Sequence, residues 1–347
     1  MGKSLDQRLR TAKIKTAGRF QKVANRKKVY VALTLPKILV EMLEREYEVE
    51  VYDRKGPISK ELLGEKMRTA DAVVVSASIA VPRDVIESAG SCLKAIVNYG
   101  VGYNNIDVEA ATERKIMVTN TPDVLTDATA TFAWCLMLAA ARRVGEGDRF
   151  IRSGKPWNLS PCDFWGRDIT GRTLGVIGTG RIGTSFALKS RGFDMKILYH
   201  DVARSETLEK LGANLVSKEE LLRESDFVSL HVPYIPATHH LIDARAFEIM
   251  KPTAILVNCA RGPVVDEKAL VAALRTGQIW GAGLDVYENE PVVSPELLEM
   301  ENVVMAPHIA SASPDSREGM ARLAAENCIA ALAGKRPGAL VNPEVLG

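Results

Sequence analysis

Short hydrophobic runs alternate with helical patterns of apolar and polar residues along the chain from Val29 onward. In the first third, helical patterns such as 37–46 and 59–69 separate predicted strands rich in β-branched residues, which lie at 29–33, 49–52, 72–75 and 95–97. Repetition of strand, helix and strand is typical of a parallel sheet that helices cover on both faces. The first part of the chain is therefore predicted to form one α/β unit.

A long helical pattern at 127–151 follows and predicts one long helix. Its most apolar part, 130–141, is shorter than the roughly 20 residues that a membrane-spanning helix needs. After an irregular segment at 153–171, a second alternating series predicts a final helix at 315–333 and strands at 173–177, 196–200, 227–231, 254–258, 281–285 and 303–305. The predicted fold class is α/β, with two Rossmann-like domains that each contain a doubly wound parallel sheet.

The length of 347 residues suits two domains, and the hydrophobic and charged fractions of 46% and 25% are those of a globular protein. The number of cysteines is odd, and no two of them form a Cys-x-x-Cys pair. This pattern argues against a disulfide framework and against a metal site. It favours a reducing compartment, and the expected location is the cytoplasm.

Residues 1–27 form a strongly basic extension in which Asp6 is the only acid. Its apolar residues fall roughly on one helical face, which is compatible with an amphipathic helix. A solvated extension is the simplest interpretation, and a surface-binding arm and an organellar import sequence are alternatives. No basic patch recurs downstream, so neither nucleic acid nor a membrane is an expected partner.

A glycine-rich motif follows the predicted strand 173–177 and opens the next helix: Gly178, Gly180 and Gly183, with Arg181 and Ile182 between the last two. Gly-x-Gly-x-x-Gly in this context is the dinucleotide-binding fingerprint. Glycine permits the tight turn, the approach of the backbone to a pyrophosphate, and the close packing of helix on strand. The free N–H groups of the helix N-terminus then bind the phosphates. We predict that this segment binds a dinucleotide cofactor.

Asp201 ends the next predicted strand, about 20 residues after the glycine motif, where a carboxylate accepts hydrogen bonds from the ribose hydroxyls. The same carboxylate would repel the 2′-phosphate of NADP. The predicted cofactor is therefore NAD, and NADP is disfavoured. His200 and Arg204 flank Asp201 and would soften this preference.

Three polar residues lie at the ends of predicted strands in the second unit: Arg261, Glu290 and His308. The carboxyl ends of the strands line the ligand crevice of an open α/β sheet. Reduction of a 2-keto acid requires a cation that holds the carboxylate and polarises the carbonyl, and arginine offers a fixed fork of donors. It also requires an acid that protonates the new alkoxide, and a histidine beside a carboxylate meets that need. We predict these residues as the catalytic set for a small 2-keto or 2-hydroxy acid.

Four segments resemble the signatures of the D-isomer-specific 2-hydroxyacid dehydrogenase family: 98–107, 258–267, 283–291 and 307–311. The resemblance implies a discontinuous substrate-binding domain, 28–125 and 315–347, and an NAD-binding Rossmann domain, 126–314, with the active site in the cleft between them. It also implies a homodimer that forms through a helix at 128–151 and an arm at 157–165. Thr131 departs from the pattern, since relatives often have an acid there.

The same resemblance implies further binding residues. Asp285 and the backbone near Cys259 and Ala260 would hold the nicotinamide carboxamide. Backbone N–H groups around Val101 and Gly102 would bind the substrate carboxylate together with the catalytic arginine. The glycines of that loop let amides point at an anion.

Within the family, segments 120–130 and 164–171 are most similar to glyoxylate/hydroxypyruvate reductases. D-3-phosphoglycerate dehydrogenase or another D-2-hydroxyacid dehydrogenase is an alternative, although loops 34–37 and 76–81 offer little cationic charge for a phosphate. A minor alternative is an NAD-responsive, corepressor-like interaction protein, in which the basic extension would bind the partner.

Overall fold

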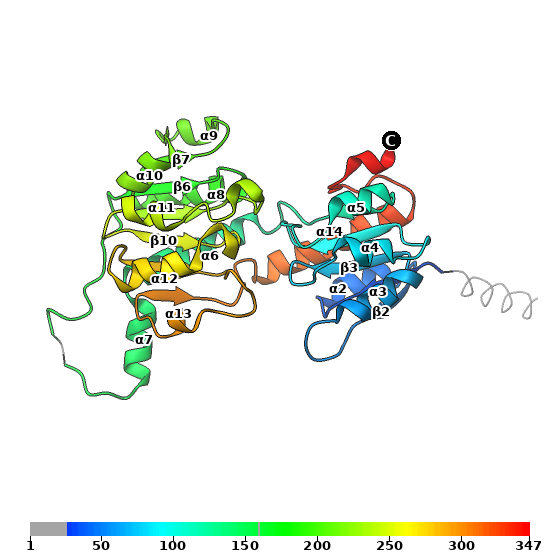
Figure 1. Ribbon diagram of the computed structural model, residues 1–347, viewed down its shortest axis with the longest axis horizontal. Coiled ribbons are helices and arrows are strands. Elements are labelled where there is room, and N and C mark those ends of the chain that lie inside the picture. Colours follow the sequence, from blue (N-terminus) through cyan, green and yellow to red (C-terminus); the bar gives the residue numbers. More distant parts are fainter. Residues whose placement is uncertain (1–25, 159) are drawn as a thin grey trace, which may run out of the picture. The chain divides into compact units, whose positions relative to one another are not determined.

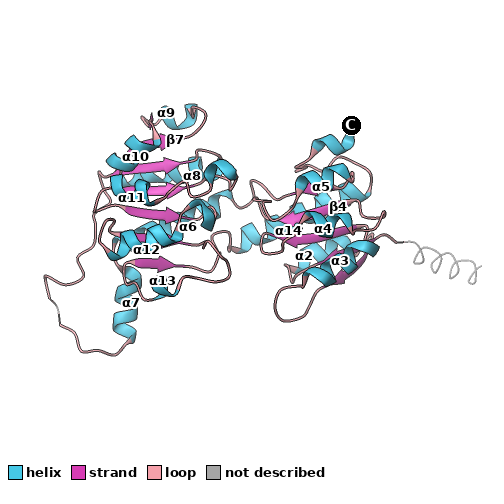
Figure 2. Ribbon diagram, in the orientation of Figure 1, coloured by secondary structure: helices cyan, strands magenta, loops and turns pink. Residues whose placement is uncertain are grey.

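The computed structural model describes residues 26–158 and 160–347, so nearly all of the predicted basic extension lies outside the described residues. The described residues form two compact units: unit 1 contains those up to Pro122 together with Arg317–Gly347, and unit 2 contains those within Asp123–Ser316. Each unit has its own parallel β-sheet packed against helices, as the sequence predicts (Figures 1 and 2). Among the described residues, no helix combines the length and the apolar character that crossing a bilayer requires.

Unit 1 consists of β1 (Lys28–Val31), α2 (Lys37–Leu43), β2 (Glu48–Val51), α3 (Lys60–Thr69), β3 (Ala72–Ser76), α4 (Arg83–Glu87), β4 (Ala95–Tyr99), α5 (Val108–Glu113), β5 (Met117–Thr119), most of α14 (Pro314–Leu332) and η4 (Pro343–Leu346). Its five strands run parallel in the order β2-β1-β3-β4-β5. The central strands β3 and β4 are buried almost throughout. Burial on both faces explains their nearly unbroken runs of apolar residues.

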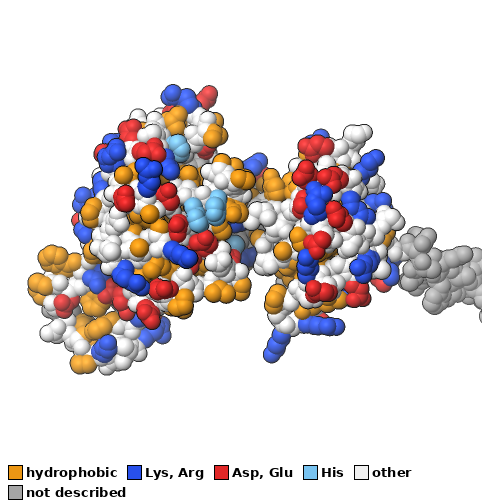
Figure 3. Space-filling view, in the orientation of Figure 1, with side chains coloured by type: hydrophobic (Ala, Val, Ile, Leu, Met, Phe, Trp, Pro, Cys, Tyr) orange, Lys and Arg blue, Asp and Glu red, His pale blue; other side chains and the backbone are white. Residues whose placement is uncertain are grey.

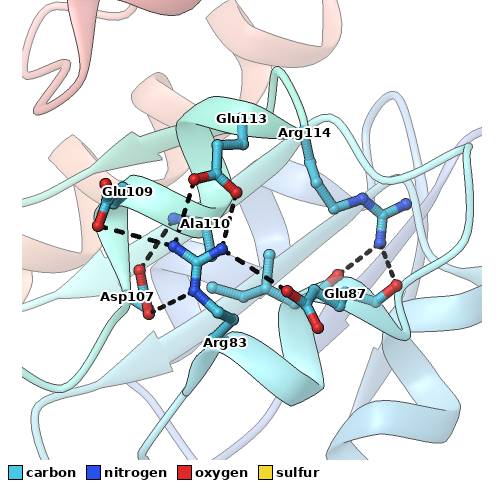
Figure 4. Close-up of polar contacts among 8 residues, drawn as sticks. Arg83, Glu87, Asp107, Glu109, Ala110, Glu113 and Arg114 are labelled. Carbon is cyan, nitrogen blue, oxygen red and sulfur yellow. Dashed lines mark hydrogen bonds and ion pairs between the residues drawn. The ribbon is translucent and has the colours of Figure 1, made fainter.

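A charged network ties α4 to α5 on the surface of unit 1 (Figure 4). The Arg83 guanidinium lies 2.7 Å from the Glu113 carboxylate and 3.6 Å from that of Asp107, and Glu87 and Glu109 also form ion pairs with it. One exposed pair contributes little stability, but several acids around one arginine hold the geometry better. The network therefore helps to fix the helices that follow β3 and β4.

Unit 2 consists of α6 (Thr126–Ala141), α7 (Val144–Arg152), β6 (Thr173–Ile177), α8 (Arg181–Lys189), η1 (Ser190–Phe193), β7 (Lys196–His200), α9 (Glu206–Glu209), β8 (Asn214–Leu215), α10 (Lys218–Glu224), β9 (Phe227–Leu230), η2 (Pro236–Thr238), α11 (Ala244–Ile249), β10 (Ile255–Asn258), η3 (Gly262–Val264), α12 (Glu267–Arg275), β11 (Gly281–Leu284), α13 (Pro295–Leu298) and β12 (Val303–Met305). The parallel strands follow the order β12-β11-β10-β9-β6-β7-β8. The order of the strands reverses at β6, and doubly wound sheets bind ligands beside such a switch point.

The prediction of one long helix at 127–151 is wrong, because the structure breaks this segment into α6 and α7. Arg143, at the break, has a left-handed backbone with a φ of 56°. That conformation costs a non-glycine residue about 1–2 kcal/mol. The Arg143 side chain donates two hydrogen bonds of 2.6 Å to Glu146, and the Arg167 N–H donates to the Ala141 carbonyl at the end of α6. A local ion pair and a hydrogen bond from Arg167, outside the segment, thus accompany the end of α6.

Candidate active site

The glycine motif forms a tight loop between β6 and α8. Gly178 has a φ of 90°, and a Cβ on it would lie 2.7 Å from the carbonyl group of His231. A Cβ on Gly183 would lie 1.9 Å from the Gly178 carbonyl oxygen. A Cβ on Gly180, in contrast, would meet nothing within 4 Å, because this glycine faces open space at the start of α8. Two of the glycines therefore permit close packing, and the third leaves room for a ligand.

An open pocket of about 710 Å³ lies at this loop, and its walls come from the glycine loop, the start of α8, the start of α6 and the start of α9. Arg181 faces it and pairs with Asp123, with 2.5 Å between Nε and Oδ1. The first N–H groups of α8 have no partners within the helix, and the helix dipole favours an anion there. The pocket therefore suits the pyrophosphate and adenosine ribose of a dinucleotide.

Asp201, directly after β7, is held by the loop that it faces. Its Oδ2 accepts hydrogen bonds from the Thr179 N–H at 2.6 Å and from the Thr179 hydroxyl at 2.9 Å, and its Oδ1 accepts one from the Val202 N–H at 2.6 Å. Partial burial raises the pKa of Asp201, but these hydrogen bonds outweigh it and hold the pKa below its usual value. Asp201 is therefore an oriented carboxylate at neutral pH.

Glu290 and His308 form a hydrogen-bonded pair, with 2.8 Å between Glu290 Oε2 and His308 Nδ1. The Tyr287 N–H donates to the second oxygen of Glu290 at 3.0 Å. Burial raises the pKa of Glu290, but the hydrogen bond and charge of His308 lower it, and the charge of Arg261 adds to that effect. The structure thus brings together the three residues that the sequence predicts as catalytic. Because Nδ1 faces the carboxylate, Nε2 of His308 is left to serve a ligand.

Asp285 fixes the segment that carries His308. This buried residue follows β11, and its two oxygens accept hydrogen bonds from the N–H groups of Ile309 at 2.8 Å and Ala310 at 2.7 Å. Its carbonyl accepts the His308 N–H at 2.9 Å. Burial raises the pKa of Asp285 despite these bonds. The nicotinamide contact expected of Asp285 stays a prediction, whereas its support of the His308 loop is a role that the sequence did not reveal.

Arg261 follows β10 in a loop that Asn258 organises. The Asn258 side chain donates to the Arg261 carbonyl at 2.9 Å and accepts the Ala260 N–H at 3.0 Å, and the guanidinium donates to the Ala260 carbonyl at 2.7 Å. Burial lowers the pKa of Arg261, and the charge of Glu290 opposes that change. Burial also raises the pKa of the Cys259 thiol well above its usual value, so this cysteine is a neutral, packed side chain.

Two further acids, Glu267 and Glu288, fix the loop that contains Glu290, and the sequence analysis missed both. The Glu288 N–H donates to the Glu267 carboxylate at 2.9 Å, and the Glu267 N–H donates to the Glu288 carboxylate at 3.0 Å. Ser294 donates its hydroxyl to Glu267 at 2.6 Å, and His240 lies 2.8 Å from Glu288. The available signal was Glu267 in the first turn of α12, a position that favours an acid.

The loop after β4, in unit 1, has its carbonyl groups held by side chains. Asn120 donates to the Val101 carbonyl at 2.8 Å, and Asn98 donates to the Gly102 carbonyl at 2.9 Å. Within the described residues, the N–H groups of Val101 and Gly102 make no hydrogen bond. Fixed carbonyls and unpaired N–H groups are what an anion-binding loop requires.

Among all the residues that the structure describes, no three His, Cys, Asp or Glu side chains gather as a metal site would require.

Residues 134–310 match the family model described as the NAD binding domain of D-isomer specific 2-hydroxyacid dehydrogenases. The glyoxylate reductase of Pyrococcus horikoshii is 50% identical over 326 residues, which cover 92% of this chain and 97% of the relative. The glyoxylate reductase of Thermococcus kodakarensis is 51% identical over 328 residues, which cover 92% of this chain and 98% of the relative. The sequence similarity therefore includes both units.

Solved structures extend the same comparison. The TT0316 protein of Thermus thermophilus matches with a TM-score of 0.85 and 42% identity, over 90% of this chain and 99% of that one. An NADPH-dependent glyoxylate/hydroxypyruvate reductase of Sinorhizobium meliloti, solved with NADP and malonate, matches with a TM-score of 0.81 and 33% identity, over 92% of this chain and 98% of that one. Both the fold and the sequence thus point to one enzyme family.

Proposed function

Because the chain belongs to the D-isomer-specific 2-hydroxyacid dehydrogenase family, we propose that it reduces glyoxylate and hydroxypyruvate to the corresponding 2-hydroxy acids with a nicotinamide cofactor. The observation that carries this proposal is the Glu290–His308 pair, 2.8 Å apart and within electrostatic reach of Arg261 at the carboxyl ends of β10 to β12. The glyoxylate reductases at about half identity support the substrate class.

Each catalytic residue has a separate task. The Arg261 guanidinium binds the substrate carboxylate and polarises the carbonyl group. His308 donates a proton from Nε2 to the carbonyl oxygen as C2 is reduced, and Glu290 orients the imidazole through its hydrogen bond with Nδ1. The N–H groups of Val101 and Gly102 bind the substrate carboxylate.

The glycine loop, Arg181 and Asp201 hold the cofactor, with the pyrophosphate at the N-terminus of α8 and the adenosine ribose at Asp201. When bound, the nicotinamide supplies the hydride for C2. An oriented carboxylate at Asp201 favours the ribose hydroxyls of NAD and repels the 2′-phosphate of NADP. We therefore expect NADH to be preferred, in contrast to the NADPH-dependent relative from Sinorhizobium meliloti.

The active form is proposed to be a homodimer. Helix α7 buries none of its residues, although two of them, Val144 and Ile151, are large and hydrophobic. In the segment that follows, Trp157 and Trp165 are 61% and 68% exposed. Figure 3 shows hydrophobic side chains gathered over this part of unit 2. Surfaces of this kind usually bind a partner, and a second copy of the chain fits the family.

The five free cysteines support a reducing compartment such as the cytoplasm.

The test is NADH oxidation by the full chain with glyoxylate, hydroxypyruvate, pyruvate, 2-ketogluconate and phosphohydroxypyruvate as separate substrates. We expect the highest kcat/KM with glyoxylate or hydroxypyruvate. A higher value with phosphohydroxypyruvate would assign the chain to phosphoglycerate metabolism instead. No oxidation with any of the five acids would refute the proposed activity.

A further inference from the structure

We propose that Glu209 is a specificity-determining residue: it neutralises Arg204 and holds it in place, and thereby withholds this cation from the 2′-phosphate of NADP. The inference rests on the proposed function, in which the adenosine ribose binds at Asp201. It assigns part of the cofactor choice to a residue other than those of the glycine motif and other than Asp201, the acid directly after β7.

Glu209 is anchored by a buried hydroxyl. It ends α9, and its Oε1 accepts hydrogen bonds from the Tyr199 hydroxyl at 2.7 Å and from Arg204 Nε at 2.9 Å. Tyr199 is completely buried in β7, and its hydroxyl also accepts the Ser205 N–H at 3.0 Å. The core of unit 2 therefore fixes the carboxylate, and the carboxylate fixes the guanidinium.

Both members of the pair, the Glu209 carboxylate and the Arg204 guanidinium, are charged. The hydrogen bonds from Tyr199 and Arg204 lower the pKa of Glu209, and the hydrogen bond to Glu209 raises the pKa of Arg204. At neutral pH the carboxylate thus cancels the charge that the guanidinium would otherwise present to a ligand.

The position of Arg204 makes this pairing relevant to the cofactor. Arg204 follows Asp201 by three residues, and the residues directly after it, Ser205 to Thr207, line the open pocket beside the glycine loop. Its side chain is 73% exposed, so it has room to turn once it is released. A free arginine is the side chain best suited to bind a phosphate with two parallel hydrogen bonds.

The test is the binding of NADH, NADPH and 2′,5′-ADP to the full chain, measured by calorimetry without any turnover. The variant Glu209→Gln keeps the shape of the side chain and its hydrogen bond to Tyr199 but removes the charge. We expect it to bind NADPH and 2′,5′-ADP about tenfold more tightly, the size that one charged hydrogen-bond partner contributes. NADH binding should change less than twofold.

Three further variants separate the pairing from a general effect of charge. Combining Glu209→Gln with Arg204→Gln should abolish the gain in NADPH affinity, because the gain requires the released guanidinium. Arg204→Gln alone should give no gain in NADPH affinity, because it leaves the Glu209 carboxylate in place and removes the guanidinium. Glu219→Gln, which removes an exposed acid of α10, should leave the affinity for NADPH unchanged.

The inference is overturned if Glu209→Gln leaves NADPH binding unchanged, or if the gain persists without Arg204 or appears equally in Glu219→Gln. If Glu209→Gln does not fold, Glu209→Ala decides in the same way, since it also removes the carboxylate: a gain in NADPH affinity supports the inference and an unchanged affinity overturns it. Failure of the proposed function is distinguishable, because these binding measurements need no turnover: the change in NADPH affinity is present or absent whether or not the chain reduces glyoxylate or hydroxypyruvate.

Discussion

Replacing Gly262 by alanine should disable the site, because two of its segments touch at this glycine. A Cβ at position 262 would lie 1.8 Å from the Tyr287 carbonyl oxygen and 2.5 Å from the Glu288 nitrogen. Ordinary van der Waals contact begins at 3.4 Å, so the shortfall to the oxygen is about 1.6 Å. The atoms in the way belong to the backbone and cannot rotate aside. The loop of Arg261 and the loop of Glu290 must therefore move apart by about that distance.

The catalytic cost follows from this displacement. A misplacement of about 1 Å typically reduces the rate on the order of 100-fold, or about 2.7 kcal/mol in the activation free energy. Forcing a methyl group into a packed contact also lowers the free energy of unfolding by about 1–3 kcal/mol. For Gly262→Ala we expect kcat/KM for glyoxylate to fall at least about 100-fold and Tm to fall by several degrees.

The assay is NADH oxidation with glyoxylate, beside thermal unfolding of the same samples. Gly192→Ala is the matched control, because a Cβ there would meet nothing within 4 Å. The control should retain kcat/KM within about twofold. A Gly262→Ala enzyme with the activity and Tm of the control would refute the claim that the two loops are fixed against each other at this point.

Three other predictions concern separate parts of the molecule. His308→Ala should abolish turnover while NADH still binds, as measured by calorimetry, and a variant that keeps a tenth of the original kcat would exclude His308 as the proton donor. Asp201 has a lowered pKa, so its carboxylate stabilises the fold above about pH 4, and this contribution is lost as the pH falls through the lower folded value. Asp201→Asn should therefore be about 1 kcal/mol less stable at pH 7 in urea, and the difference should shrink as the pH falls below about 4; an undiminished difference would contradict this. Trp165→Glu should shift the mass in light scattering from dimer to monomer, and a monomeric parent would remove the proposed interface.

Sequence patterns were informative where a strand is buried and a motif is local. The strands 173–177 and 196–200 have the predicted bounds because apolar runs there fill the core on both faces. The glycine motif was readable because its strand, turn and helix are contiguous. In contrast, β8 has only two residues, Asn214 and Leu215, and both are exposed, so no hydrophobic pattern marks it.

The missed features all depend on contacts between distant segments. At the break after α6, the N–H of Arg167, far along the chain, donates to the Ala141 carbonyl. The support that Asp285 gives to Ile309 joins residues 24 positions apart. Likewise, the reciprocal bonds of Glu267 and Glu288 join the start of α12 to the loop after β11. Propensity and periodicity carry no information about such pairs, so the sequence predicted the catalytic residues but not the groups that hold them.

The most direct test of the central claim is the transfer of hydrogen from the nicotinamide to C2 of the substrate. The full chain is incubated with glyoxylate and NADH that carries deuterium at C4 of the nicotinamide, and the product is analysed by NMR. The account predicts glycolate with one deuterium on C2, formed in step with NAD and only from the NADH that is deuterated on the transferred face. The contrary result is glycolate that carries no deuterium, whichever face of the nicotinamide was deuterated in the NADH, or no glycolate at all.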